Sequence, residues 1–303
     1  MSDVFTFIAA ERANYPIVWM CRLLAVSRAS FYRWLRGGGP SPREVRHREL
    51  AGQVKAVYDA AGGQAGRDQI VKILAEQGIA VAVATVGAIM RELGIKAVRT
   101  KAWKKTTEQD PSARTEHIKN HMLDDDGSRC FTSDTPGTRL CGDITYLRTD
   151  EGWLYLATVI DLFNGEIIGW RVADHMRTEL VIDAVTMARD HGRLHPNGAV
   201  YHSDRGSQFT SEAFQTWCAA NHVTQSMGAV GVCWDNAVAE SFFSHLKTEM
   251  YYQQSWPTRI HARTAIMEYI EIWYNRRRPH TRAGGRPPAA AREAFTTGHA
   301  KAA

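Results

Sequence analysis

Residues 139–172 read RLCGDITYLRTDEGWLYLATVIDLFNGEIIGWRV, and the periodicity of the chain changes here. Over 139–149 polar and apolar residues alternate, so that one face of a strand carries Cys141, Asp143, Thr145 and Leu147. The continuous apolar run at 152–163 is typical of a central strand, and 165–172 predicts a third strand. The tetrapeptide FNGE at 163–166 indicates a type I′ hairpin between them. We therefore expect three consecutive antiparallel strands.

The residues that follow alternate between helical and strand patterns. Helices are predicted over 178–192 and 211–221, and short buried strands over 199–202 and 223–226. Strands that alternate with helices imply parallel pairing beside the first strand, and hence an α/β fold. A last helix over 235–250 has one face that carries, at i, i+4 and i+7, Glu240, Ser244 and Lys247.

Three acidic residues occupy informative positions in these elements. Asp143 lies within an apolar strand, Asp204 just past the end of a short strand, and Glu240 one turn into a helix. Burying a lone carboxylate is costly unless it is paired or bound to a metal. Each acid alone is more often a surface or capping residue, but together they can converge on one site. We therefore predict that all three are catalytic and bind Mg²⁺ or Mn²⁺, with two ions expected.

The charge distribution favours an anionic partner. The chain of 303 residues is 44% apolar and 23% charged, with a net charge of +5. Residues 1–121 hold 19 Lys and Arg against 11 Asp and Glu, 122–250 hold 9 against 18, and 251–303 hold 9 against 3. Basic flanks are typical of proteins that bind polyanions, although a well-solvated surface gives the same pattern.

The cysteines and apolar runs exclude other classes. The five cysteines are odd in number, widely spaced and never form C-x-x-C, so we expect neither a disulfide framework nor a zinc knuckle. The most apolar stretch, 79–90, has 12 residues, whereas a membrane span needs about 20. The first ten residues lack the basic region of a signal peptide. We expect a cytoplasmic protein without membrane contact.

The N-terminal third has helical periodicity. Residues 1–38 predict two short helices around a turn, with Ser27 as N-cap and Gly37 as stop. This pattern fits a helix-turn-helix and a plain helical hairpin about equally. After a Gly- and Pro-rich linker, residues 44–96 predict further helices and a second helix-turn-helix, with Thr85 as the cap of its last helix.

Three more segments complete the expected organisation. Residues 97–135 form a basic linker, residues 136–252 the catalytic domain, and residues 253–303 a C-terminal helix and basic tail. Residues 96–107, where the linker begins, hold five basic residues around Trp103 and little apolar periodicity, which suits an extended segment along phosphates.

These motifs together resemble the integrase core of DDE-type transposases, which are related to retroviral integrases. More narrowly, the chain resembles the OrfB-type product of the insertion-sequence-three family. The motifs are GDITYL, HSDRGSQF, SMGAVGVCWDNAVAESFFSHLKTE and YNRRRPH, and they are specific in spacing: 60 residues separate Asp143 from Asp204, and 35 separate Asp204 from Glu240. The resemblance covers residues 12–295 and is strongest over 142–280. It implies a ribonuclease H-like core with a mixed five-stranded sheet of order 3-2-1-4-5.

The resemblance also implies an activity. Such enzymes nick DNA at the 3′ end of an element, and the freed hydroxyl attacks a second phosphodiester, which results in transposition or integration. Lys247 would contact the terminal DNA of the element, and the loop at 227–234 would move near DNA. The implied partners are DNA, further copies of the chain on DNA at the nucleoid, and an upstream OrfA-type partner or fusion. The alternative is a non-catalytic DNA-binding regulator derived from a transposase, which the intact triad disfavours.

Other candidate residues follow from charge and position. Besides Lys247, the expected DNA-binding residues are Asn236, Arg28, Arg33, Lys104, Lys105, Arg276 and Arg277. The arginines at 276–278 follow a helix predicted over 258–275, so a favourable helix-end charge effect competes with phosphate binding, and both can hold.

The chain also departs from the family pattern. Cys141 stands where members usually have Trp, and TRAGG follows RPH in place of a Leu-Gly pair. His117 and His121 have zinc-ligand spacing, but Cys130 and Cys141 do not form C-x-x-C, so no zinc module is expected.

Overall fold

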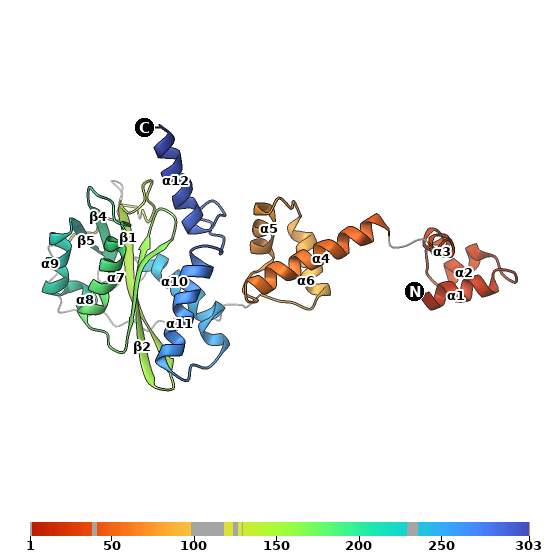
Figure 1. Ribbon diagram of the computed structural model, residues 1–303, viewed down its shortest axis with the longest axis horizontal. Coiled ribbons are helices and arrows are strands. Elements are labelled where there is room, and N and C mark those ends of the chain that lie inside the picture. The colour runs from red at the N-terminus through yellow and green to blue at the C-terminus, as the bar shows by residue number, and fades with distance from the viewer. Residues whose placement is uncertain are drawn as a thin grey trace. The chain divides into compact units, whose positions relative to one another are not determined.

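The computed structural model describes residues 2–37, 41–97, 118–123, 127–128, 130–228 and 236–302 (Figure 1). The chain divides into two compact units, residues 1–55 and 56–303. The helices are α1 Ser2–Glu11, α2 Ile17–Leu23, α3 Arg28–Leu35, α4 Pro42–Ala60, α5 Arg67–Glu76, α6 Val83–Glu92, α7 Thr178–Asp190, α8 Ser207–Thr210, α9 Glu212–Ala220, α10 Ala237–Glu249, α11 Arg259–Glu268 and α12 Pro288–Ala302. The strands are β1 Arg139–Thr149, β2 Gly152–Asp161, β3 Ile167–Ala173, β4 Ala199–Ser203 and β5 Val223–Met227.

In the first unit, α1, α2 and α3 pack around the fully buried ring of Phe31. Ser27 is the N-cap residue of α3, as predicted, although its side chain makes no capping hydrogen bond. The turn between α2 and α3 places Ala25 in the left-handed region, with a φ of 52°. Helix α1, which the sequence pattern missed, contributes Phe5 and Ile8 to this small core.

The second helical region contains α4, α5 and α6. Ile70 and Leu74 of α5 are fully buried, as are Val86 and Ile89 of α6. The prediction that Thr85 caps α6 is wrong, because the helix begins at Val83 with Ala82 at its N-cap. No helix in the described part of the chain is both long and apolar enough to cross a membrane.

The sheet confirms the predicted ribonuclease H-like topology, with five strands in the order β3-β2-β1-β4-β5. Strands β1, β2 and β3 pair antiparallel, whereas β4 is parallel to β1 and β5 is parallel to β4. The pairing of β1 with β4 ends where Cys141 meets His202, while its pairing with β2 continues to Thr149. Asp143 is therefore the second residue past the point where β4 leaves β1.

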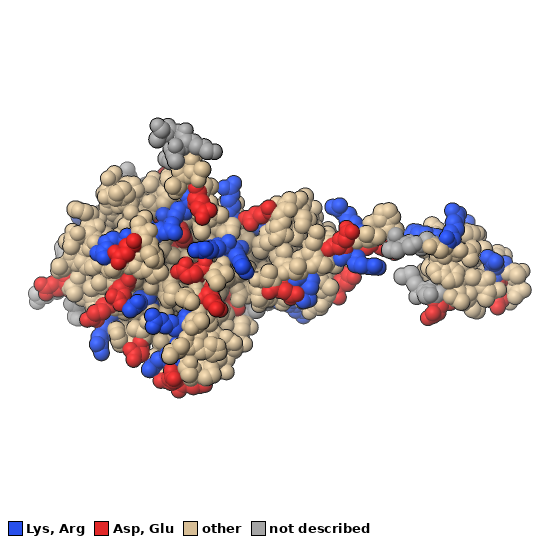
Figure 2. All heavy atoms as spheres, in the orientation of Figure 1, with Lys and Arg blue, Asp and Glu red and all other residues tan. Residues whose placement is uncertain are grey.

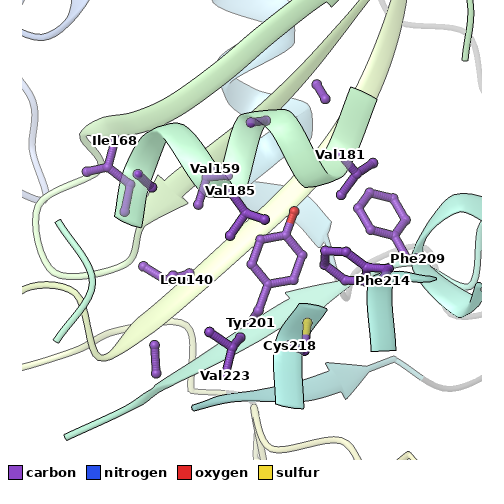
Figure 3. Packing of buried hydrophobic residues seen from close by; sticks show 14 of the residues in the cluster. Leu140, Val159, Ile168, Val181, Val185, Tyr201, Phe209, Phe214, Cys218 and Val223 are labelled. Carbon is purple, nitrogen blue, oxygen red and sulfur yellow. The ribbon is translucent and has the colours of Figure 1, made fainter. Parts of the chain in front are cut away.

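Helices cover both faces of the sheet (Figure 1). On one face, α7 packs on β2 and β3 and α9 on β5, while α10 contacts β1 from the opposite face. The core under α7 and α9 surrounds Tyr201 of β4, whose ring lies beside Phe209 and Phe214 (Figure 3). The alternation along β1 and the continuous apolar run of β2 thus place apolar side chains in this core.

The turn between β2 and β3 is not the predicted type I′ hairpin. That turn needs positive φ at both central residues, whereas Gly165 has a φ of 80° and the only non-glycine residues with positive φ in the described part of the chain are Ala25 and His222. Asn164 is buried instead, and its amide donates to the carbonyl of Pro288 at 2.7 Å. The asparagine makes a tertiary contact with the C-terminal region.

The predicted helix over 258–275 is divided in the structure. Helix α11 ends at Glu268, and a π-helix, η3, continues over Tyr269–Tyr274. Asn275 then donates to the carbonyl of Ile167 and accepts from its backbone N–H, at 2.9 and 3.0 Å. Finally, Arg292 of α12 forms ion pairs with Asp161 and Glu166 at the end of β2 and in the following turn. The C-terminal segments are thus bonded to the β2–β3 hairpin.

Candidate active site

Asp143 is positioned by the residue before it. A Cβ atom at Gly142 would lie 1.7 Å from the Tyr201 hydroxyl oxygen, so a glycine is required for β1 to approach this buried ring. The carbonyl of Gly142 accepts from the Asn236 amide at 3.3 Å. One Oδ of Asp143 accepts from the backbone N–H of Ile144 at 2.7 Å. The Asp143 carboxylate therefore lies on a strand that is fixed at Gly142 by packing against Tyr201 and by the hydrogen bond from Asn236.

Asp204 follows directly after β4, where its side chain closes a short turn. Its Oδ1 accepts from the backbone N–H of Gly206 at 3.0 Å, and the Ser203 hydroxyl donates to the Asp204 carbonyl at 3.0 Å. His202, two residues before Asp204, is buried, and its Nδ1 lies 2.8 Å from the Ser226 hydroxyl.

Glu240 lies in the first turn of α10, on the face predicted from the helical spacing. Glu240, Ser244 and Lys247 are partly exposed, while the buried residues of the helix include Phe242, Phe243 and Leu246. Asn236 precedes the helix, and its bond to Gly142 ties the start of α10 to β1. The helix therefore carries both an acid and a base toward the strand that holds Asp143.

The electrostatics show that these groups share one environment. Burial raises the pKa of Asp143 well above its ordinary value, and the charges of Asp204 and Glu240 raise it further. Burial also raises the pKa of Asp204 and of Glu240. Burial lowers the pKa of Lys247, while the charge of Asp143 opposes that shift. Two carboxyl groups and one ammonium group thus lie within electrostatic reach of Asp143.

The donor set fits a hard divalent cation. Carboxylate oxygens are the ligands that Mg²⁺ prefers, and a cation would offset the burial and mutual repulsion that raise these pKa values. Within the described residues, no group of three or more His, Cys, Asp or Glu side chains is arranged so that it could hold a metal ion. Residues 229–235, which lead into α10, lie outside the described residues.

The predicted DNA-binding residues fall into different environments. Arg28 and Arg33 are exposed on α3, and Arg33 lies 3.4 Å from Glu44. Arg276 and Arg277 are exposed, whereas Asn236 is only 9% exposed. Lys104 and Lys105 lie outside the described residues, as does most of the predicted linker. On the face drawn in Figure 2, basic and acidic side chains are interspersed.

Two features near the site were not predicted from the sequence. Arg205, beside Asp204, donates from Nε to the carbonyl of Gly228 at 2.9 Å, and so ties the end of β4 to the segment after β5. Its place between an acid and a glycine was the only available signal. The second feature is an exposed pair of aromatic rings, Tyr146 and Trp153, whose centroids are 5.3 Å apart. Their contact follows from strand register, which the sequence pattern does not fix.

A buried network supports the far end of α10. Glu249 accepts from the Tyr269 hydroxyl at 2.8 Å, from the Trp273 indole at 3.2 Å and from Arg278 Nη2 at 2.9 Å. Although burial favours a higher value, hydrogen bonds from His245 and Arg278 and the Arg278 charge hold the pKa of Glu249 at about 2. Helix α10 is therefore bonded to η3 and to the arginine run that follows it.

Comparison with known proteins agrees with this architecture. Family models described as integrase core domain match residues 133–233 and 221–288, and one described as HTH-like domain matches residues 46–103. The chain is 36% identical over 285 residues to the transposase InsF for insertion sequence IS3A of Escherichia coli (strain K12), which covers 94% of this chain and 96% of that protein. It is 32% identical over 276 residues to the insertion element IS600 uncharacterized 31 kDa protein of Shigella sonnei, with coverage of 91% and 98%.

Solved structures with a similar chain course include two retroviral proteins. The HTLV-2 integrase catalytic core domain in complex with magnesium has a TM-score of 0.40 at 16% identity and covers 52% of this chain and 97% of its own. The catalytic core domain of BIV integrase has a TM-score of 0.39 at 15% identity, with coverage of 55% and 99%.

Proposed function

Because this chain belongs to the family of the InsF-type transposases of insertion sequence IS3, we propose that it cuts and joins DNA through Asp143, Asp204 and Glu240. Its integrase core makes it a polynucleotidyl transferase, a class that transfers a DNA strand from one phosphodiester to another. The observation that supports this assignment of residues is the shared environment of the three carboxyl groups, in which the charges of Asp204 and Glu240 act on Asp143.

The three carboxylates would hold Mg²⁺ or Mn²⁺, with two ions as the proposed number. When bound, such ions stabilise the attacking and leaving oxygens and neutralise the phosphate. The backbone contacts of the carboxylates prepare this role, since Ile144 N–H orients Asp143 and Gly206 N–H orients Asp204. Asn236 fixes the start of α10 against β1, and so sets the position of Glu240.

Lys247 would bind a DNA phosphate next to the reacting one. Its ammonium group lies near Asp143, and it forms no ion pair within the described residues. Arg276 and Arg277, which are exposed, would bind phosphates farther along the duplex. Arg28, Arg33, Lys104 and Lys105 are proposed for the same role in the N-terminal region and the linker. We further propose that copies of the chain assemble on DNA, with an OrfA-type partner or fusion, and that the chain acts in the cytoplasm at the nucleoid.

The test is a cleavage and joining assay on DNA. A labelled duplex with the terminal sequence of the encoding element is incubated with the full chain and Mg²⁺, and nicked and joined products are measured separately. Asp143→Asn, Asp204→Asn and Glu240→Gln should each lower both rates by at least about 100-fold, because lost charge stabilisation is worth several kcal/mol. DNA affinity should stay within a few-fold.

The matched control is Asp190→Asn, which removes an exposed acid paired with Arg189. It should cut and join at the wild-type rate. Wild-type rates from any of the three triad variants would refute the assignment of that residue. If the wild-type chain yields nicked DNA but no joined DNA, the activity is that of a nuclease and not of a transferase.

A further inference from the structure

The β1–β2 ribbon carries an exposed aromatic pair flanked by two cations. Tyr146 and Trp153 are 39% and 42% exposed, and their rings meet edge to face at 87°. The Arg148 guanidinium lies 5.5 Å from the centroid of the Trp153 ring, and Lys247 Nζ lies 5.3 Å from that of Tyr146. These four residues are called the aromatic platform below.

Strand register places the three ribbon residues of the platform, Tyr146, Arg148 and Trp153, on one face. Arg148 pairs directly with Trp153, and Tyr146 lies two residues from Arg148 on the same strand, so their side chains point to the same side. Lys247 approaches the Tyr146 ring from α10. Asp143 points to the other side, because it is an odd number of residues from Tyr146. The pairing of β1 with β4 ends at Cys141, so Tyr146 lies beyond the part of β1 that β4 covers.

The charges of the platform favour an anionic occupant. Neither Lys247 nor Arg148 forms an ion pair with an acid among the residues that the structure describes. An exposed tyrosine and tryptophan, together with two cations that form no ion pair within the described residues, offer what an unpaired nucleotide needs: a stacking surface for the base and positive charge for the phosphates.

Lys247 makes the platform continuous with the proposed active site. Its ammonium group lies over the Tyr146 ring, and the charge of Asp143 acts on it. Tyr146 lies three positions after Asp143 along an extended strand, a distance of about 10 Å. About three stacked nucleotides of a DNA strand cover that length.

We propose that the aromatic platform binds an unpaired nucleotide of the DNA strand next to the reacting phosphate, with its base stacked on Tyr146 or Trp153 and its phosphates on Lys247 and Arg148. This inference rests on the proposed function, since it takes DNA as the substrate and Asp143 as part of its site. It assigns a role to Tyr146, Arg148 and Trp153, which the proposed cleavage chemistry does not use.

The probe is a nine-nucleotide thymidine strand with 2-aminopurine at its centre, whose fluorescence is quenched when the base stacks. It is titrated with the full chain in Ca²⁺, which avoids cleavage, and compared with the same strand annealed to its complement. The wild-type chain should bind the single strand more tightly than the duplex and should quench it. Tyr146→Leu and Trp153→Leu should each weaken single-strand binding at least about fivefold and reduce the quenching.

Two sets of variants separate stacking from a general defect. Tyr252→Leu removes an aromatic side chain that is 67% exposed and lies outside the platform, and it should behave as wild type. Tyr146→Phe and Trp153→Phe keep a ring at each position and should stay within about twofold. Circular dichroism of the leucine variants should match wild type, because both side chains are partly exposed.

The proposal is overturned if Tyr146→Leu and Trp153→Leu bind and quench the single strand as Tyr252→Leu does. It is also overturned if, without DNA, these variants change the oligomeric state seen in sedimentation, since the rings would then form a protein interface. Asp204→Asn should bind and quench like wild type. If the wild-type chain quenches the single strand but does not cleave DNA, the result counts against the proposed function alone. If the wild-type chain cleaves DNA but the two leucine variants bind and quench as wild type does, the result counts against the platform alone.

Discussion

At the scale of single residues, Gly142 determines how closely β1 and the core of the sheet approach. The hydroxyl of Tyr201 occupies the space where a Cβ atom would lie, and the next residue is Asp143. Any side chain at 142 must displace either the strand or the buried ring. The packing of the core therefore affects the position of Asp143, for which we propose a catalytic role.

Gly142→Ala should destabilise the protein by about 1–3 kcal/mol, because extra atoms in a packed core force side chains or backbone to move. The measurement is the free energy of unfolding in urea. The matched control is Gly298→Ala in α12, where nothing lies within 4 Å of an added Cβ. It should be neutral or slightly stabilising, since alanine favours helix. Equal stability of the two variants would contradict the close approach.

Residue patterns predicted the three acids but not their surroundings. The positions of Asp143, Asp204 and Glu240 in their elements follow from local periodicity, which the structure reproduces. The contacts that orient them do not, because Asn236, Arg205 and Tyr201 reach partners that are distant in sequence. Likewise, the sequence does not indicate which of the three consecutive arginines at 276–278 is buried. In the structure only Arg278 is buried, and it forms an ion pair with Glu249.

At the scale of elements, the strands were easier to predict than the turns and helix ends. The strand at 139–149 has the same limits in the structure, because alternation along it reflects burial on two faces. The hairpin type and the cap of α6 were wrong, because Asn164 is used in a tertiary contact and α6 begins two residues before Thr85. The sequence pattern gives no sign of the π-helix η3 after α11. This element packs against α10, where the rings of Tyr274 and Phe242 are in contact.

The attachment of α10 to η3 depends on the ion pair between Glu249 and Arg278. Glu249→Gln should destabilise the protein by about 3–5 kcal/mol, because it leaves a buried arginine without its counter-charge. The control is Glu268→Gln, an exposed acid on α11, which should change stability by less than about 0.5 kcal/mol. Urea unfolding at neutral pH measures both, and similar values for the two variants would contradict the structural role.

The same pair predicts a dependence of stability on pH. The folded-state pKa of Glu249 is about 2 and its ordinary value is 4.5. Because the folded-state value is the lower one, this stabilisation is fully present above pH 4.5 and is lost as the pH falls toward 2. Wild type should therefore lose more stability than Glu249→Gln between pH 5 and pH 3, as thermal unfolding would show. Parallel profiles would contradict the low pKa.

At the scale of the whole molecule, the distribution of charge along the chain suits a polyanionic partner. The two flanking segments are basic, whereas residues 122–250 have an excess of acids that includes the triad. Cations at the triad would reconcile this acidic centre with bound phosphates. The affinity for DNA should consequently fall steeply with salt, because each phosphate contact releases counterions.

The exposed arginines should contribute to that salt dependence. Arg276→Ala with Arg277→Ala should reduce the slope of log affinity against log salt by about 2, or about 1 per lost phosphate contact. Arg189→Ala, which removes an exposed arginine paired with Asp190, should leave the slope unchanged. Fluorescence anisotropy of a labelled duplex at several salt concentrations gives the slopes. An unchanged slope in the double variant would assign Arg276 and Arg277 to helix-end stabilisation alone.

We propose that the three carboxylates hold the metal ions used for DNA cleavage. The most direct measurement is the cleavage rate of Asp204→Cys with Mg²⁺ and with Mn²⁺, since a thiolate is a poor ligand for Mg²⁺ and a better one for softer metals. We predict that wild type cleaves with both ions, whereas the variant is inactive with Mg²⁺ and regains cleavage with Mn²⁺. Cleavage by the variant at the wild-type rate with Mg²⁺ would contradict the claim.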